Sequence, residues 1–194
     1  MSYLRHRYKS CFIGEFGSGK TSFILSVLGR PIDKVKTTLG IDFFTQTVSV
    51  ANTTAYVTLW DTAGAERYHS LMHSYIRDSD IVFVIYDITD INAMASVRRC
   101  LRDIEGLSPT VVAVVGTKSD LGQKSHDVHD AIESWKHNSW TLITGTCSSL
   151  RPETTRKIFK RCLGLLVKPS KPVENSPVTI HVRPVTPEQQ KCCT

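Results

Sequence analysis

Two kinds of apolar pattern alternate along this chain and predict its elements. Residues 81–86 (IVFVIY) and 110–115 (TVVAVV) are almost continuously apolar, as expected of strands buried on both faces of a sheet. Segments between such runs, such as residues 92–104, repeat apolar side chains at the three- and four-residue spacing of an amphipathic helix. Because strands alternate with helices, the pattern favours a mostly parallel sheet with helices on both faces.

The same patterns set the bounds of the remaining elements. Strands are expected over residues 9–13, 41–50, 55–60, 81–86, 110–115 and 140–143. Helices are expected over residues 21–28, 92–104, 127–137 and 152–167, and residues 67–77 should form a short helix or a mobile segment. A turn at residues 52–54 would join two β-rich segments into an antiparallel hairpin. The expected fold class is α/β, with a six-stranded mostly parallel sheet and one antiparallel edge strand.

The composition changes at Lys168. Five of the eight prolines follow it, at positions 169, 172, 177, 184 and 187, and helical periodicity is absent there. Such a segment has too little apolar content to offset the entropy of folding, so we expect a disordered tail. The predicted organisation is one globular domain over residues 1–167 and a Pro-rich hypervariable tail over residues 168–194.

Composition also removes several classes of protein. No run of 18 apolar residues occurs in the 194, so no spanning helix is expected. The first nine residues lack the apolar centre of a secretory signal. The six cysteines lack metal or disulfide spacing, and four of them are expected to be reduced thiols in apolar or helical surroundings, namely Cys11, Cys100, Cys147 and Cys162.

The formal net charge is +6, and part of the basic excess lies near the C-terminus. These basic residues are Arg151, Arg156, Lys157, Lys160, Arg161, Lys168 and Lys171. Such residues can contact nucleic acid or an anionic membrane. No nucleic-acid motif accompanies them, so nucleic acid is not expected as a partner. A solvated helix face and a membrane-facing helix both stay open.

A glycine-rich stretch at residues 14–21 (GEFGSGKT) matches the phosphate-loop pattern of Gly, four residues, Gly, Lys and then Ser or Thr. Gly14, Gly17 and Gly19 would let backbone N–H groups converge on a phosphate. Lys20 would supply a charge for the β and γ oxygens, and the Thr21 hydroxyl would ligate Mg²⁺. The strand before the loop and the helix after it fit this interpretation, because a helix N-terminus attracts anions.

Four further stretches narrow the class of nucleotide-binding protein. They are residues 38–43 (TLGIDF), 60–64 (WDTAG), 116–120 (GTKSD) and 147–150 (CSSL). Together with the phosphate loop they resemble the five nucleotide-binding boxes of small Ras-like GTPases, in order and at family spacing over residues 9–166. The resemblance implies a P-loop NTPase fold of the Ras type that binds GTP or GDP with Mg²⁺ and hydrolyses GTP to GDP and phosphate.

The resemblance implies a switch built around a metal ion. Thr21 and Thr38 would ligate Mg²⁺ directly, and Asp61 would hold it through water. Thr38 would do so only while the γ-phosphate is present, and the Gly64 N–H would sense that phosphate. Loss of the phosphate would release both loops. The implied catalytic set is Lys20, Thr38 and Gly64, with Ala65 at the position of the usual glutamine.

At the base end, Asp120 would accept two hydrogen bonds from the guanine edge. Adenine lacks that donor pair, so GTP is selected over ATP. Lys118 would pack along the base, and Thr117 stands where most Ras-like proteins have Asn and the Rho family has Thr. The Ser149 N–H would cap the base. The full nucleotide-contacting set is expected to be Gly14, Phe16, Gly17, Ser18, Gly19, Lys20, Thr21, Ser22, Thr38, Gly64, Thr117, Lys118, Asp120, Ser148, Ser149 and Leu150.

Within the superfamily, residues 38–43 and 60–68 (WDTAGAERY) are similar to Rab GTPases. Phe43, Trp60 and Tyr75 match the aromatic triad that Rabs present to effectors. The alternative is that these aromatics are ordinary half-buried core residues. The runs at residues 74–79 (SYIRDS) and 86–89 (YDIT) resemble the Golgi branch, the sixth Rab in the usual count.

The C-terminal residues 191–194 (KCCT) resemble the Cys-Cys-x ends on which Rabs carry two geranylgeranyl groups, here on Cys192 and Cys193. Two lipid chains give stable anchoring where one is marginal. The implied partners are Rab escort protein, geranylgeranyl transferase, GDI and a membrane, with effectors, an exchange factor and a GAP acting at the switch regions. We expect a monomer on the cytoplasmic face of Golgi membranes, with a cytosolic pool bound to GDI.

Three features depart from the family pattern. Ala65 stands where a glutamine orients the attacking water, so intrinsic hydrolysis should be slow. Phe16 would crowd an arginine finger entering the phosphate loop. The loop over residues 28–35 is one residue short and has no aromatic, so Pro31 or Ile32 would cover the guanine less well and nucleotide release should be faster.

Three functions therefore stay open. The first is a Rab-type GTP/GDP switch that recruits effectors in vesicle traffic. The second is a GTP-binding scaffold with negligible turnover, which Ala65 favours. The third, a P-loop kinase or ATPase, is disfavoured by the Lys-Ser-Asp run at residues 118–120.

Overall fold

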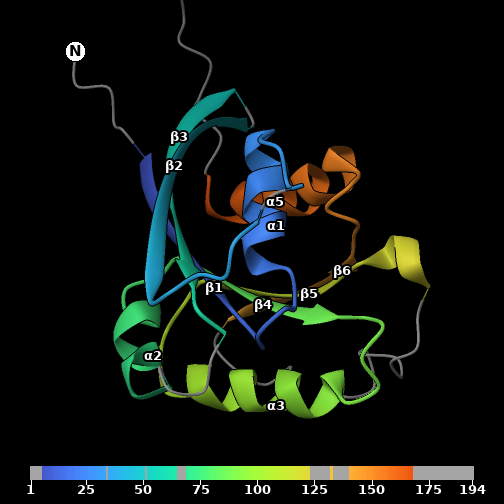
Figure 1. The fold of residues 1–194 in the computed structure, drawn as a ribbon. Coiled ribbons are helices and arrows are strands. Elements are labelled where there is room, and N and C mark those ends of the chain that lie inside the picture. The colour runs from blue at the N-terminus through green and yellow to red at the C-terminus, as the bar shows by residue number, and fades with distance from the viewer. Residues whose placement is uncertain are drawn as a thin grey trace, which may run out of the picture.

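The computed structural model describes residues 6–33, 35–50, 52–64, 69–122, 132 and 140–167. One six-stranded sheet runs through this part of the chain in the order β2-β3-β1-β4-β5-β6 (Figure 1). The strands are β1 His6–Ile13, β2 Ile41–Val50, β3 Thr53–Thr62, β4 Ile81–Asp87, β5 Val111–Thr117 and β6 Thr141–Thr146. The helices are α1 Lys20–Leu28, α2 His69–Ile76, α3 Ala93–Ile104, the short η2 Ser119–Leu121 and α5 Pro152–Leu166.

Strand β2 is the only antiparallel member of the described sheet, and it forms one edge. It pairs with β3 along its whole length, from Ile41 opposite Thr62 to Val50 opposite Thr53. The β1–β3, β1–β4, β4–β5 and β5–β6 pairs are all parallel. This arrangement confirms the predicted α/β class, the number of strands and the antiparallel edge.

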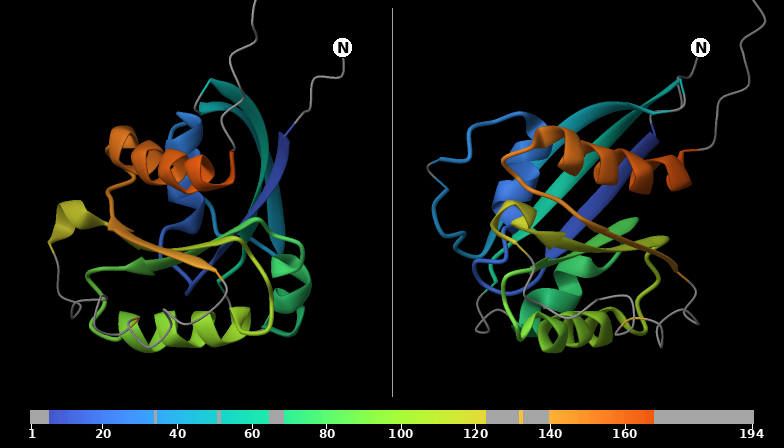
Figure 2. Two further views of the ribbon diagram at one scale, coloured as in Figure 1. Left: turned by 180° about the vertical axis from the view of Figure 1, so that it is seen from behind. Right: turned by 90° about the vertical axis from the view of Figure 1, so that its right-hand side faces the viewer.

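Helices cover both faces of the sheet, as the alternating pattern predicted. α1 and α5 lie on one face, and α2 and α3 lie on the other (Figures 1 and 2). Under α1 and α5, Phe83 stacks on Phe12 with ring centroids 4.6 Å apart and meets Phe23 at 5.7 Å and Phe159 at 5.9 Å. Because side chains alternate along a strand, the neighbours Val82 and Val84 join the second core under α3.

Several predicted bounds were wrong by a few residues. The turn expected at residues 52–54 lies earlier, because Thr53 already pairs with Val50 in the β2–β3 ladder and only positions 51 and 52 separate the strands. Asn52 has a φ of 60°, a left-handed conformation that Asn adopts more readily than most residues. β6 extends to Thr146 because its polar end still pairs with β5, although no apolar pattern marks it.

Other predictions lie outside the described residues. The helix expected at residues 127–137 is described only at Ile132, which is helical. The tail over residues 168–194 is not described, so its disorder stays a prediction. Within the described ranges, Cys11, Cys100, Cys147 and Cys162 are buried free thiols, as predicted. No described helix is long and apolar enough to cross a membrane.

Candidate functional site

The carboxyl ends of the parallel strands bring the predicted site residues, together with Asp87, to one edge of the sheet. The phosphate loop follows β1, Asp87 ends β4, and Lys118 follows β5. Asp61 comes from β3, which pairs with β1. Ligand sites in such sheets lie at the carboxyl edge, since loops from neighbouring strands converge there.

The phosphate loop is folded tightly against the sheet. Gly14 has a φ of 141°, and a Cβ there would lie 2.0 Å from the Ile85 carbonyl oxygen, so only glycine fits. The Lys20 Nζ donates to the carbonyl oxygens of Gly14 and Glu15, both at 2.9 Å. Burial lowers the pKa of Lys20, and nearby carboxylates oppose that shift. The lysine is thus held across the loop, where its charge faces any bound phosphate.

Three oxygen-bearing side chains converge beside this loop. The Thr21 hydroxyl donates to Asp61 Oδ2 at 2.6 Å, and the Thr38 hydroxyl donates to the same oxygen at 3.1 Å. The two hydroxyl oxygens lie 3.0 Å apart. The second oxygen, Asp61 Oδ1, is buried and has no hydrogen-bond partner among the described residues. Burial raises the pKa of Asp61, and the two threonine hydrogen bonds oppose that shift.

This oxygen cluster fits the expected magnesium ion. Hydroxyl and carboxylate oxygens are the ligands that Mg²⁺ prefers in proteins. An unpartnered buried carboxylate oxygen is costly unless a cation or a water satisfies it. Thr21, Thr38 and Asp61 are the residues that would hold the ion, and this ligand set stays a prediction.

The segments that carry Thr38 and Gly64 are joined to each other and to the phosphate loop. The Ala63 N–H donates to the Gly40 carbonyl oxygen at 2.9 Å. A Cβ on Gly64 would lie 2.4 Å from the Phe16 nitrogen, so the end of this segment rests on the phosphate-loop backbone. Ala65 lies outside the described residues. A change at the phosphates therefore can reach both segments through direct contacts.

The base end of the site is fixed by side-chain hydrogen bonds. The Thr117 hydroxyl lies 2.6 Å from the Ser18 carbonyl oxygen, to which it donates, and 3.1 Å from that of Tyr86. This contact joins the segment that would read the base to the segment that would hold the phosphates. Ser148 donates to Asp120 Oδ1 at 2.5 Å, which orients the carboxylate expected to meet guanine.

Two polar contacts of the site were not predicted. The Lys118 Nζ lies 2.5 Å from Asp87 Oδ2, and Arg99 of α3 forms an ion pair with Glu15 of the phosphate loop. Burial alone would raise the pKa of Asp87, but hydrogen bonds from Lys118 and Thr89 hold it below its usual value. The signal for Asp87 was present, since a carboxylate directly after a buried strand lies at the sheet's carboxyl edge. No feature of the sequence marked Arg99 as a site residue, because its partner Glu15 lies far from it in the sequence.

A chamber of about 230 Å³ lies between the phosphate loop and the Thr38 segment. Its lining includes many of the predicted nucleotide-contacting residues: Phe16, Gly17, Gly19, Lys20, Thr21, Ser22, Thr38, Gly64 and Lys118. Ser149 and Leu150 do not line it; Ser149 is half-buried and the Leu150 side chain is exposed. Their contacts with the base stay predictions.

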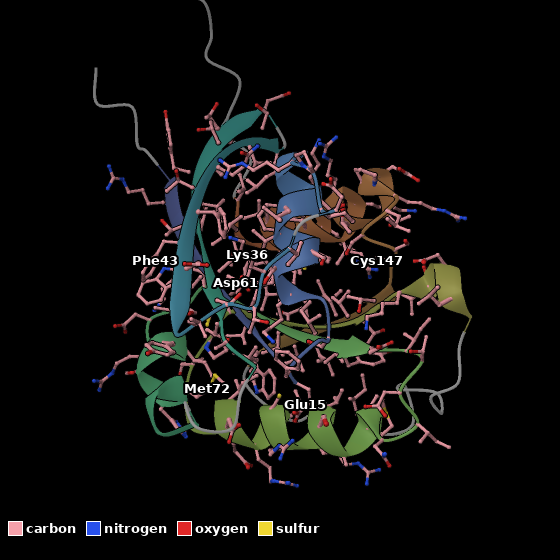
Figure 3. All side chains as sticks on the ribbon, viewed as in Figure 1. Glu15, Lys36, Phe43, Asp61, Met72 and Cys147 are labelled. Atoms are coloured by element: carbon pink, nitrogen blue, oxygen red, sulfur yellow. The ribbon has the colours of Figure 1, made fainter. Side chains whose placement is uncertain are left out.

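The three aromatics expected to face effectors lie on or near the β2–β3 side of the sheet. Phe43 is 56% exposed and points away from the sheet (Figure 3). It meets Trp60 edge to face, with ring centroids 4.7 Å apart. Trp60 and Tyr75 are half-buried and pack against the core under α3. Phe43 therefore has an exposed ring, whereas Trp60 and Tyr75 are partly buried against the core. Cys192 and Cys193 lie outside the described residues.

A comparison with protein-family models agrees with this geometry. The model described as the Ras family matches residues 9–167, which is most of the 194-residue chain. The matched range begins in β1 and ends just after α5, so it contains the phosphate loop, the oxygen cluster and the base-end contacts. The chain belongs to the Ras family.

Proposed function

We propose that this chain is a Rab-type small GTPase that recruits effectors in vesicle traffic at the Golgi and hydrolyses GTP slowly by itself. Membership of the Ras family gives the general part: a small GTPase that switches between GTP and GDP states and meets regulators and effectors. The Rab type, the Golgi role and the slow hydrolysis are the specific parts of the proposal.

The observation that supports the switch most strongly is the convergence of Thr21, Thr38 and Asp61. Thr21 follows the phosphate loop, and Thr38 lies on a separate loop that its hydroxyl joins to this cluster by side-chain hydrogen bonds. A bound Mg²⁺ supplies charge neutralisation at the β and γ oxygens. Loss of the γ-phosphate would remove the interaction that keeps Thr38 at the metal site. The Ala63–Gly40 hydrogen bond joins the Thr38 loop to the segment that ends at Gly64, so that segment would respond as well.

Guanine selection would rest on Asp120. The Ser148 hydroxyl donates a hydrogen bond to Asp120 Oδ1, and Asp120 is exposed to solvent. It can therefore accept the paired N–H donors of guanine, whereas adenine would leave it unpaired. Lys118 is held by Asp87, so its aliphatic stem is positioned before the base arrives.

Slow hydrolysis follows from side-chain chemistry. Lys20 is placed to stabilise charge on the phosphates, and Gly64 lies against the phosphate-loop backbone. Alanine at position 65 has no group that can orient a water molecule. The Phe16 side chain is 66% exposed at the phosphate chamber, where it would obstruct an arginine from a partner. A GTP-binding scaffold with negligible turnover is the second candidate, and the same two residues favour it.

The Rab assignment rests on the aromatic pair Phe43–Trp60, with Tyr75 nearby, and on the two C-terminal cysteines. An exposed aromatic beside half-buried ones is typical of interface centres. Geranylgeranyl groups on Cys192 and Cys193 would anchor the chain to the cytoplasmic face of a membrane. Rab escort protein, geranylgeranyl transferase and GDI are the partners that this proposal implies.

Two measurements test the proposal. Titrations with fluorescent GTP and ATP analogues should show strong preference for guanine, and equal affinity would overturn the GTPase assignment. Single-turnover GTP hydrolysis should be slow alone and faster with a Rab-type GAP that brings its own glutamine. Turnover that stays negligible with every Rab-type GAP would favour the scaffold.

A further inference from the structure

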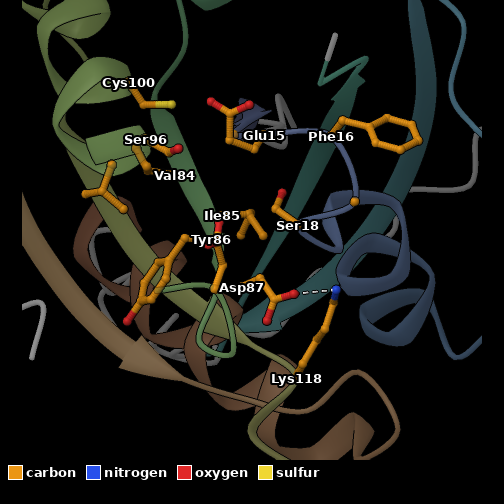
Figure 4. A pocket seen from close by; sticks show the side chains of 14 residues that line it. Glu15, Phe16, Ser18, Val84, Ile85, Tyr86, Asp87, Ser96, Cys100 and Lys118 are labelled. Atoms are coloured by element: carbon orange, nitrogen blue, oxygen red, sulfur yellow. Dashed lines mark hydrogen bonds and ion pairs between the residues drawn. The ribbon is translucent and has the colours of Figure 1, made fainter. Parts of the chain in front are cut away.

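A second chamber, of about 300 Å³, lies between the phosphate loop and α3 (Figure 4). It shares Phe16, Gly17 and Lys118 with the phosphate chamber but also reaches Ser96 and Cys100 of α3. A volume of this size exceeds that of a few water molecules and lies at the lower end of small-molecule sites, roughly 300–1,000 Å³. Asp90, Ser96, Val97 and Cys100 lie outside the expected nucleotide-contacting set, so this side of the chamber has no assigned occupant.

Part of the lining is apolar. Val84 of β4 and Val97 of α3 line the chamber. Figure 4 shows the Tyr86 ring at one side of it. Val84 and Val97 are buried, so these walls are held by the core under α3. A flat ring or a short apolar chain would contact these walls.

The chamber also contains a polar group that lacks a partner. The Ser18 side-chain oxygen is buried, with the residue only 2% exposed, and it has no hydrogen-bond partner among the described residues. Figure 4 shows this oxygen directed into the chamber. A hydroxyl removed from water without a partner costs free energy, so a ligand with a polar N–H would be stabilised here.

The charges around the chamber are mostly negative. Among the described residues that line it, Glu15, Asp87 and Asp90 stand against the single cation Lys118. Lys118 already pairs with Asp87, and Arg99 pairs with Glu15. Asp90 accepts a backbone hydrogen bond from Asn92 at 2.9 Å and has no cationic partner in the described part of the chain. Asp90 lines the chamber and is exposed to solvent, so its carboxylate is accessible to a cation with N–H donors.

We propose that this chamber is a binding site for a small organic cation with a planar apolar body. Its charged N–H groups would meet Asp90 and the Ser18 hydroxyl, and its ring would lie against Val97 and Tyr86. The occupant would touch the phosphate loop through Ser18 without entering the space of the phosphates. This site is additional to the GTPase function and does not depend on turnover.

Benzamidine is a suitable probe, and neutral benzamide is its matched control. The full chain is loaded with GDP, which fills the nucleotide site, and ¹H–¹⁵N spectra are recorded during titration with each compound. Benzamidine should produce saturable shifts centred on the amides of Ser18, Ser96 and Cys100. Benzamide should shift them far less. Equal shifts from both compounds, no saturation, or shifts centred elsewhere would overturn the proposal.

Three variants sharpen the test. Asp90→Asn keeps the side chain's shape and should weaken benzamidine binding about five- to ten-fold, because a charged hydrogen bond becomes a neutral one. Ser96→Phe should abolish binding by filling the chamber. Glu105→Gln removes a carboxylate at the far end of α3 and should leave binding unchanged. Equal weakening by Asp90→Asn and Glu105→Gln would show nonspecific attraction and refute the site, whether or not Ser96→Phe folds.

Discussion

The hydroxyl of Thr117 offers a sharp test of how the base end and the phosphate end of the site are coupled. Thr117→Val keeps the shape of the side chain and removes the donor that meets the Ser18 carbonyl at 2.6 Å. A hydroxyl donates one hydrogen, so this shorter contact is the main bond, and the one to Tyr86 at 3.1 Å is secondary. Both Thr117 and Ser18 are buried, so water cannot replace the lost donor.

The expected magnitude follows from that burial. Leaving a buried carbonyl without a donor costs about 1–3 kcal/mol. If about 1–2 kcal/mol of this falls on the nucleotide-binding geometry of the loop, GDP affinity drops roughly 5- to 30-fold. Most of that loss should appear as faster release, since affinity changes within one site fall mainly on the dissociation rate.

Stopped-flow release of a fluorescent GDP analogue measures the effect, and urea unfolding of the same protein reports stability. Thr155→Val is the matched control, because Thr155 is equally buried, its hydroxyl lies 3.0 Å from both the Pro152 carbonyl oxygen and the Ser26 hydroxyl, and it lines neither chamber. It should lower stability and leave release unchanged. The reasoning is refuted if Thr117→Val loses stability as Thr155→Val does while its GDP release stays at the wild-type rate.

Three further predictions concern turnover, the core and the thiols. Ala65→Gln should speed intrinsic single-turnover hydrolysis by about ten-fold or more, because a water-orienting group is restored, and no gain would contradict the account of slow turnover. Phe83→Ala should destabilise the chain by about 3–5 kcal/mol in urea unfolding, since Phe83 joins three other buried rings, and a loss below about 1 kcal/mol would show that the ring cluster is not central. The double variant Cys192→Ser/Cys193→Ser should show no fast reaction with a thiol reagent at pH 8 until it is denatured, because burial raises the pKa of each core thiol, that of Cys100 for example to about 12. A rapidly reacting native thiol in that variant would contradict the described burial.

The sheet was predictable because its signals are local and redundant. Continuous apolar runs marked β4 and β5, and the phosphate-loop glycines marked the turn after β1. The ends of β3 and β6 were missed for a physical reason: Thr53 and Thr146 lie in strands because a neighbouring strand pairs with them, and their own polarity gives no strand signal. Pairing partners decide strand ends more than side-chain polarity does.

The candidate site also combines features that the sequence predicts with features that only the fold determines. Lys20 and Thr21 were expected from the phosphate-loop pattern and Asp61 from the resemblance to Ras-like GTPases, and the structure brings Thr21 and Asp61 together. The supporting contacts were not predictable, because they join segments that only the fold brings together. Thr117 and Ser18 are 99 residues apart, and Ser148 and Asp120 are 28 apart. Nothing in either segment alone indicates its partner.

The nucleotide carried by the purified full-length chain tests the central claim most directly. The protein is isolated with Mg²⁺ present, denatured, and its released nucleotide is separated by HPLC, with the GTP fraction followed over time. We predict guanine nucleotide alone, near one per chain, with GTP converting only slowly to GDP. Adenine nucleotide, or a chain that retains no nucleotide and binds none on addition of GTP, would contradict a guanine-specific switch built on Thr38, Asp61 and Asp120.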